Sequence, residues 1–168
     1  MLTPKPIDPS IFQYLRVEPE MGVLIWTRSM GRAKGGDEAG NENRGYRYVT
    51  VRGVCYAVHR VIFFYVHGWC PDRIDHEDKD GLNCSINNLR PATNRENAIN
   101  CAIRRTNKSG FRGVHFDASR GKWMARVAVA PNVEKNLGRF ATAEEAARVY
   151  DAAAVRFYGE FAQLNFPT

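Results

Sequence analysis

The chain has 168 residues, of which 44% are hydrophobic and 25% charged, and its formal net charge is +6. This length accommodates one domain of ordinary size or two small ones, and the hydrophobic content excludes a chain that is disordered throughout. The net charge is concentrated, because residues 101–126 contain seven basic residues and one acidic residue. Such a stretch is typical of nucleic-acid binding, although a solvated basic linker has the same composition.

Leader, membrane and zinc signals are missing from the sequence. Residues 1–10 contain three prolines and no apolar run, so no secretory signal is expected. No segment approaches the ~18 consecutive apolar residues of a membrane span. The four cysteines form no C-x-x-C pair and have no histidine at zinc-finger spacing. We therefore expect a cytoplasmic protein with reduced thiols, no membrane association and no structural zinc.

The first seventy residues predict short strands and one helix. Elements are expected at residues 11–15 (helical turn), 23–26 (strand), 29–43 (loop), and 46–51 with 54–58 (hairpin). Residues 59–67, HRVIFFYVH, are apolar nearly all round and predict a buried helix that is stopped by Gly68 and Pro71. Its His59 and His67 are expected to be structural rather than catalytic.

Residues 74–97, IDHEDKDGLNCSINNLRPATNREN, carry the densest group of reactive side chains. A short strand over 74–76 would present Asp75 and His76, and a loop rich in Asp, Gly and Asn follows. Residues 86–90 are expected to return as a second strand, which Pro91 ends. Thr93–Glu96 has the pattern of a capping box, so a helix with Asn97 in its first turn should follow.

This order of side chains is suited to phosphodiester hydrolysis. The oxygens of Asp75 and Asn97, with open positions for water and phosphate, suit magnesium. A free imidazole titrates near ~6.5, so His76 can accept a proton from water at pH 7. An Asp-His pair alone is more often a surface turn, and the spacing of the whole set is what favours chemistry.

The segment resembles the HNH, or ββα-metal, motif of phage and intron-type homing endonucleases. The resemblance implies that His76 is the general base, that Asp75 and Asn97 are the metal ligands, and that Asn88 braces the catalytic loop through its backbone. It also implies a divalent metal cofactor, Mg²⁺. Cys84 is a departure, since the family often has Asn there. Further points of likeness are His59-Arg60, Gly68-Trp69 and Pro71.

Residues 111–168 have a second organisation, three strands followed by one helix. Strands are expected at 111–116, 122–130 and 135–140, and the alternation of residues 122–130 predicts one buried and one open face. Thr142–Glu145 is a second capping box, and the helix behind it should run to about Tyr158 and end at Gly159.

The motifs of this module are FRGV, GKW, LGRF, TAEEAA, YDAAA and LNFP, in that order. They resemble the plant ethylene-response-factor, or Apetala-type, DNA-binding domain, which implies that the open sheet face enters the major groove of double-stranded DNA. His115, Ala128 and Asn136 stand where the family has Arg, Arg and Trp, so base specificity is not inherited. The residues expected to contact DNA are Arg104, Arg105, Lys108, Arg112, His115, Lys122, Arg126, Asn136 and Arg139.

The sequence therefore predicts an α+β protein with three parts. They are an HNH endonuclease domain with an N-terminal β-hairpin and helix (1–103), a basic linker (104–110), and a three-stranded antiparallel sheet packed on one helix (111–168). We predict a homing-type endonuclease that nicks DNA as a monomer, in the host cell cytoplasm if it is phage-encoded. The alternatives are a DNA-binding transcription regulator without nuclease activity and a nucleic-acid-binding protein of low specificity.

Overall fold

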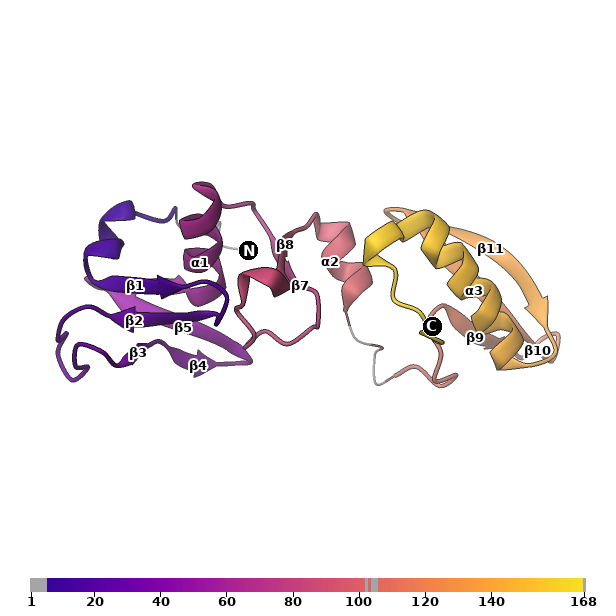
Figure 1. Cartoon of the computed structure of the whole chain (residues 1–168). Helices are drawn as coiled ribbons and strands as arrows, with labels where there is room; N and C mark the ends of the chain where they lie inside the picture. The colour runs from indigo at the N-terminus through magenta and orange to yellow at the C-terminus, as the bar shows by residue number, and fades with distance from the viewer. Residues whose placement is uncertain (1–5, 102, 104–105, 168) are drawn as a thin grey trace. The chain divides into compact units, whose positions relative to one another are not determined.

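The computed structural model describes residues 6–101, 103 and 106–167, and the fold is α+β with small antiparallel sheets (Figure 1). Contacts divide the chain into two compact units, Met1–Thr93 and Asn94–Thr168. Each unit has its own hydrophobic core. The predicted domain limits, 1–103 and 111–168, stay a prediction, and the predicted contact residues Arg104 and Arg105 lie outside the described residues.

Two three-stranded sheets form most of the first unit, with strand orders β1-β2-β3 and β4-β5-β6. Their strands are β1 (Leu15–Glu18), β2 (Val23–Trp26), β3 (Glu38–Ala39), β4 (Asn41–Asn43), β5 (Tyr46–Val51) and β6 (Val54–Ala57). The β5–β6 hairpin is confirmed, and Arg52 and Gly53 both have positive φ, as a two-residue type I′ turn requires. The predicted loop over 29–43 is wrong at its end, where β3 and β4 form by pairing with β2 and β5.

The helix α1 (Val58–His67) packs between these sheets and the segment that follows it. Val58, Val61, Ile62 and Phe63 are buried, and Gly68 ends the helix in the left-handed conformation at φ 73°. The predicted helix is confirmed, but it is not buried all round, because Tyr65 is 52% exposed. One face therefore anchors the core while the other meets solvent.

A two-stranded antiparallel ladder follows, formed by β7 (Ile74–His76) and β8 (Leu89–Pro91). Residues 86–88 are expected in the return strand but form a 3-10 helix. The Ile86 amide at its start donates to the Pro19 carbonyl in the β1–β2 turn at 2.8 Å. The prediction that Pro91 ends the pairing is wrong by one residue, since Pro91 pairs with Ile74. The ladder presents Asp75 and His76 as predicted.

The second unit is built on a three-stranded antiparallel sheet of order β11-β10-β9. The strands are β9 (Val114–Asp117), β10 (Lys122–Ala130) and β11 (Val133–Phe140). The predicted bounds of β10 match the structure, whereas the first strand begins at Val114 rather than Phe111. The reason is Gly113, whose φ of 71° interrupts an extended chain.

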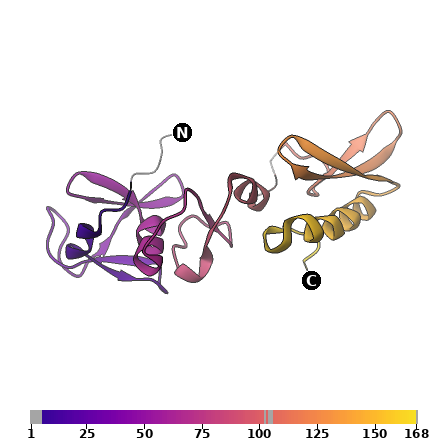
Figure 2. The same cartoon turned by 90° about the horizontal axis from the view of Figure 1, so that it is seen from above.

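The helix α3 (Ala143–Tyr158) covers one face of this sheet and leaves the other face open (Figure 2). Its predicted capping box is confirmed, since Thr142 accepts from the Glu145 amide and Glu145 accepts from the Thr142 amide. Small side chains let the helix approach closely, and Ala146, Ala147 and Ala154 are fully buried.

Two further attachments complete the second unit. Arg95, on α2 (Asn94–Asn100), donates to the carbonyls of Ala128 and Val129 at 3.1 and 2.9 Å. The helix α2 therefore packs with the sheet module. On α3, the carboxylate of Asp151 accepts hydrogen bonds from the backbone amides of Asn165 and Phe166, and Asn165 Oδ1 accepts from the Arg112 amide.

Candidate functional site

The carboxylate of Asp75 lies opposite Arg90 in the β7–β8 ladder. Nε and a terminal nitrogen of Arg90 both lie 3.0 Å from Asp75 Oδ2, and the Asp75 side chain is 5% exposed. Removing the guanidinium would leave a buried carboxylate without its countercharge, which costs roughly 3–5 kcal/mol in proteins. Arg90 therefore holds the Asp75 side chain in place, and the sequence analysis did not foresee this partner.

His76 projects to the opposite face of the ladder, because successive strand residues alternate. It is 7% exposed, and its ring lies 5.0 Å from the His59 ring and 5.9 Å from the Tyr46 ring, between centroids. Burial lowers the pKa of His76, and the nearby carboxylates of Asp78 and Asp75 only partly oppose this effect. The imidazole is thus neutral at pH 7, the state in which it can accept a proton.

Asn88 connects the two ends of the loop between β7 and β8. Its Oδ1 accepts from the Asp78 amide at 3.0 Å, and its Nδ2 donates to Asp78 Oδ1 and to the Asn83 carbonyl, both at 2.9 Å. Burial raises the pKa of Asp78, but hydrogen bonds from Asn83, the Asp80 amide and Asn88 outweigh it and lower the pKa overall. These bonds are those expected of a loop brace, while a role of Asn88 in catalysis stays a prediction.

Asn97 lies on α2 and is half-buried. Two residues, Ala92 and Thr93, separate that helix from β8. A carboxylate from Asp75 and an amide oxygen from Asn97 are the donor types that a hard cation such as Mg²⁺ prefers. Asp75 belongs to the first unit and Asn97 to the second, and each is of a donor type that suits the implied metal. The assignment of these two residues as its ligands stays a prediction.

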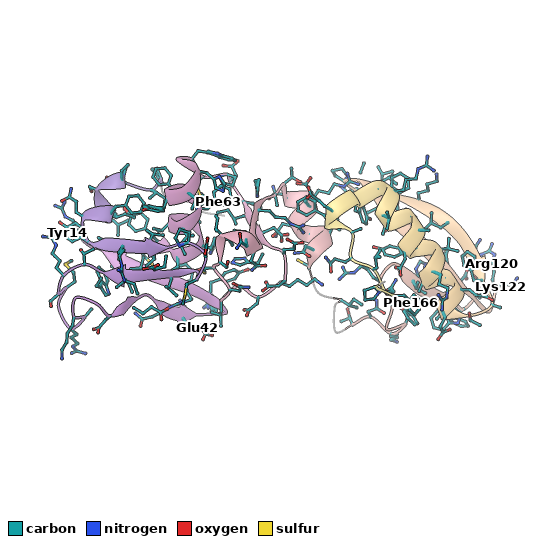
Figure 3. The ribbon with its side chains drawn as sticks, in the orientation of Figure 1. Tyr14, Glu42, Phe63, Arg120, Lys122 and Phe166 are labelled. Carbon is teal, nitrogen blue, oxygen red and sulfur yellow. The ribbon has the colours of Figure 1, made fainter. Side chains whose placement is uncertain are left out.

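The open face of the second unit's sheet carries most of the predicted DNA-contact residues. Residues directly opposite in an antiparallel ladder share a face, so His115, Met124 and Arg139 form one row. Arg126 pairs with Asn136 in the next row, and Lys122 pairs with Asp117 at the β9–β10 end. Arg120 and Lys122 lie together at that end of the sheet (Figure 3).

Two acidic residues share this face with the basic ones. Asp117 Oδ2 accepts from Arg139 Nε at 2.9 Å, and Glu134 lies 3.4 Å from Arg126. Hydrogen bonds from Ser119 and Arg139 hold the pKa of Asp117 well below its usual range. Arg126 and Arg139, which are predicted to contact DNA, are therefore already paired with carboxylates of the same sheet.

Arg112 and Lys108 differ from the rest of the predicted contact set in their position. The guanidinium of Arg112 donates to the carbonyls of Ile99 and Cys101 at 3.2 and 2.6 Å, so it satisfies backbone groups at the C-terminal end of α2. Lys108 is exposed in the segment before the sheet. Burial and the charge of Arg126 lower the pKa of His115, which makes this side chain a neutral hydrogen-bonding group on the sheet face.

Sequence reasoning missed three contributors: Arg90, Arg95 and the approach of Cys84 to the two histidines. Arg90 could have been found from the expected hairpin, since the residue opposite Asp75 in a two-stranded ladder follows from its register. The other two depend on packing between segments that are far apart in sequence. Among the helices of the described residues, none combines the length and the apolar character needed to span a membrane.

Comparison with known proteins supports both halves of the arrangement. Residues 56–99 match the family of HNH endonucleases. No solved structure matches the chain.

The second likeness is to plant transcription factors and covers about a third of this chain. The AP2-like ethylene-responsive transcription factor AIL7 of Arabidopsis thaliana is 49% identical over 57 residues, 33% of this chain and 11% of that protein. The ethylene-responsive transcription factor ERN3 of Medicago truncatula is 46% identical over 63 residues, 37% of this chain and 26% of that protein. The chain thus spans only a minor part of these relatives. It joins a segment that matches HNH endonucleases to a segment similar to AP2-like and ethylene-responsive transcription factors.

Proposed function

We propose that the protein is a metal-dependent DNA endonuclease of the homing type that hydrolyses phosphodiester bonds and nicks double-stranded DNA. The observation that carries the proposal lies within the segment that matches HNH endonucleases. There, Asp75 and His76 are buried on β7, and Asn88 holds the loop that follows them. Buried polar groups cost stability unless they are hydrogen-bonded. A turn with only a structural role has no need of a buried Asp-His pair, which supports a chemical role for these residues.

In this proposal His76 is the general base that accepts a proton from the attacking water. Its neutral state follows from its burial. Asp75 and Asn97 are the ligands of one Mg²⁺, which supplies charge stabilisation at the phosphate and at the leaving 3′ oxygen. Arg90 keeps Asp75 oriented, and Asn88 keeps the loop closed behind His76.

The second unit binds double-stranded DNA in this proposal and orients it for the first. Its open sheet face offers Lys122, Arg126 and Arg139 to phosphates and His115 and Asn136 to hydrogen-bonding groups. Lys108, with Arg104 and Arg105, would add contacts from the preceding segment. Cytoplasmic location, a monomeric state and a phage or intron origin remain predictions of the sequence.

The test is conversion of supercoiled plasmid to nicked circles by the purified full chain, with magnesium and with chelator. We expect magnesium-dependent nicking that His76→Ala abolishes without loss of DNA binding. His67→Ala is the matched control, because His67 is an exposed histidine at the end of α1. Cutting by His76→Ala at the wild-type rate would contradict the assigned mechanism.

A transcription regulator without nuclease activity is the second candidate, since the relatives of the second unit are named as transcription factors. It predicts a shifted mobility of DNA with no cutting under any condition. To avoid missing a rare target, the assay is repeated on DNA of the source genome. A protein of low specificity, the third candidate, would show no preference for one duplex over random competitor.

A further inference from the structure

Three potential metal ligands from different segments of the first unit converge behind the β7–β8 ladder. His59 comes from α1, His76 from β7 and Cys84 from the loop before the 3-10 helix. One ligand atom of each residue, a ring nitrogen or the sulfur, lies within 4.8 Å of the others. Cys84 is 1% exposed and His76 7% exposed, so these two are sheltered from bulk water, while His59 is half-buried.

The positions of these groups are fixed by packing. A Cβ on Gly22, which has φ 70°, would lie 2.6 Å from the Cys84 carbonyl carbon, so the β1–β2 turn presses directly on the backbone of Cys84. The His59 and His76 rings meet edge to face, at an interplanar angle of 75°. Tyr46 packs against both rings, with its centroid 5.9 Å from each.

The hydrogen-bonding state of His59 points to a missing partner. In the described part of the chain, Nδ1 of His59 is buried and has no hydrogen-bond partner. Burial, together with the charges of His76 and Arg60, lowers the pKa of His59 to about 3, so the ring is neutral at pH 7. A neutral imidazole with a buried unpaired nitrogen is costly in a fold and is also the form that binds a metal.

We propose that His59, His76 and Cys84 form a binding site for a thiophilic divalent cation such as Zn²⁺. Two imidazole nitrogens and one thiolate are the ligand types that zinc selects, and a fourth position remains for water. Tetrahedral bonds of ~2.0–2.3 Å place ligand atoms about 3.3–3.8 Å apart. Because the ligand atoms lie within 4.8 Å of one another, bonding to one cation requires them to approach by up to about 1–1.5 Å.

Binding displaces one proton and adds no other reactant. The Cys84 thiol loses its proton to solvent and donates the sulfur electron pair to the cation, while both imidazoles bind as neutral ligands. Burial raises the pKa of the Cys84 thiol to about 11, so the thiol is protonated before the cation arrives. The cation then replaces a buried proton at this sulfur.

The consequence for DNA cutting rests on the proposed function. A cation held by the His76 ring occupies a lone pair that would otherwise accept the proton of the attacking water. Zinc at this site would therefore stop cutting while leaving the oxygen ligands Asp75 and Asn97 available to magnesium. The binding itself requires no nuclease activity and is measured separately.

The first measurement uses Co²⁺ as the probe on the chelator-treated full chain. We expect a saturable near-ultraviolet band of thiolate-to-cobalt charge transfer at one equivalent, which Zn²⁺ displaces. Cys84→Ser should abolish the band and weaken metal binding by more than about 10-fold, since loss of even an outer-shell partner costs about 10–100-fold. Cys70→Ser, a half-buried cysteine of the same unit, is the matched control and should keep the band.

The second measurement protects the test against misfolding. If circular dichroism shows that Cys84→Ser is unfolded, His59→Gln decides, with an expected loss of affinity of more than about 10-fold. Absence of the band in the wild type, its persistence in Cys84→Ser, or unchanged affinity in His59→Gln overturns the proposal. Zinc inhibition of magnesium-dependent nicking is assayed in parallel, and a protein that never nicks refutes the nuclease while the cobalt spectrum still decides the site.

Discussion

The pairing of Asp75 with Arg90 bears on folding and on the metal site proposed above. Both nitrogens of Arg90 contact the same carboxylate oxygen, so the negative charge of Asp75 is partly neutralised before any metal arrives. A cation bound by Asp75, as proposed, would share this carboxylate with a guanidinium. We therefore expect Mg²⁺ to bind weakly to the free protein and more strongly once DNA phosphate adds a ligand.

Asn88 offers a direct test of the loop brace. Asn88→Ala removes three hydrogen bonds and leaves the Asp78 amide and the Asn83 carbonyl without this partner. We expect the free energy of unfolding of the first unit to fall by about 1–3 kcal/mol, measured by urea denaturation. Asn87→Ala changes an exposed neighbour and should shift stability by less than about 0.5 kcal/mol. Equal effects of the two substitutions would contradict the role of Asn88 as a loop brace.

His59 makes stability depend on pH in a defined direction. Its pKa is about 3 in the fold and near 6.5 when unfolded, so below pH 6.5 the unfolded chain binds a proton that the folded chain refuses. The contribution of neutral His59 to the free energy of unfolding is complete above about pH 6.5. It is lost as the pH falls, by up to about 1.4 kcal/mol per pH unit. Urea midpoints with chelator present, between about pH 6.5 and 5, should fall less steeply for His59→Gln than for the wild type. Parallel profiles would contradict the shift.

At the scale of elements, Gly113 is required for the folding of the second unit. A Cβ there would lie 2.1 Å from the Tyr150 ring and 2.7 Å from the Arg126 carbonyl, at φ 71°. Gly113→Ala should therefore prevent β9 from pairing while α3 is docked, and the second unit should fail to fold. Gly110→Ala has a similar φ of 75° but meets no atom within 4 Å, so it should cost only about 1–2 kcal/mol. Thermal unfolding by circular dichroism separates the two outcomes.

Elements with strong local signals were predictable from the sequence, and those made by distant pairing were not. The capping box at Thr142, the alternation in β10 and the Arg52-Gly53 turn each specify their structure locally. The strands β3 and β4 have two and three residues, and no local pattern distinguishes them from loop. Their pairing with β2 and β5 stabilises them, which only the tertiary fold reveals.

The candidate site divides in the same way. The order Asp75, His76, Asn88 and Asn97 is readable from the sequence, because the strand and the loop that carry the first three are local elements, while the capping box at Thr93 stays a prediction. The convergence of His59 and Cys84 on His76 is not readable, since these residues come from a helix, a loop and a strand that meet only through packing. In the sequence, Cys84 differs from the residue that the family often has, and no local pattern predicts its neighbours. The structure places it beside His59 and His76, which are potential metal ligands.

At the scale of the whole molecule, the net charge of +6 overstates the unpaired positive charge that the open sheet face would offer to DNA. Asp117 and Glu134 act as internal counterions, so fewer dissolved cations are released when phosphates bind. Glu134→Gln should free Arg126, tighten binding to duplex DNA at low salt, and steepen the plot of log affinity against log salt by up to about 0.9. Fluorescence anisotropy over a range of salt concentrations measures this slope.

The matched control is Glu144→Gln, which removes the same charge from the first turn of α3, on the side of the module away from the open sheet face. It should change affinity slightly and leave the slope unaltered, because no basic residue of the sheet is released. Identical slopes for Glu134→Gln and the wild type would mean that Arg126 does not contact phosphate.

The hydrogen bonds that join Asp151, Asn165 and the Arg112 amide link positions 53 residues apart. A ribosome releases the chain from its N-terminal end, at about 5–20 residues per second. The first unit can therefore fold while the second is still being made, but the second cannot close until Asn165 has left the exit tunnel. Any chain that stops before this residue should carry a folded first unit and an open second one, so premature termination removes the second unit.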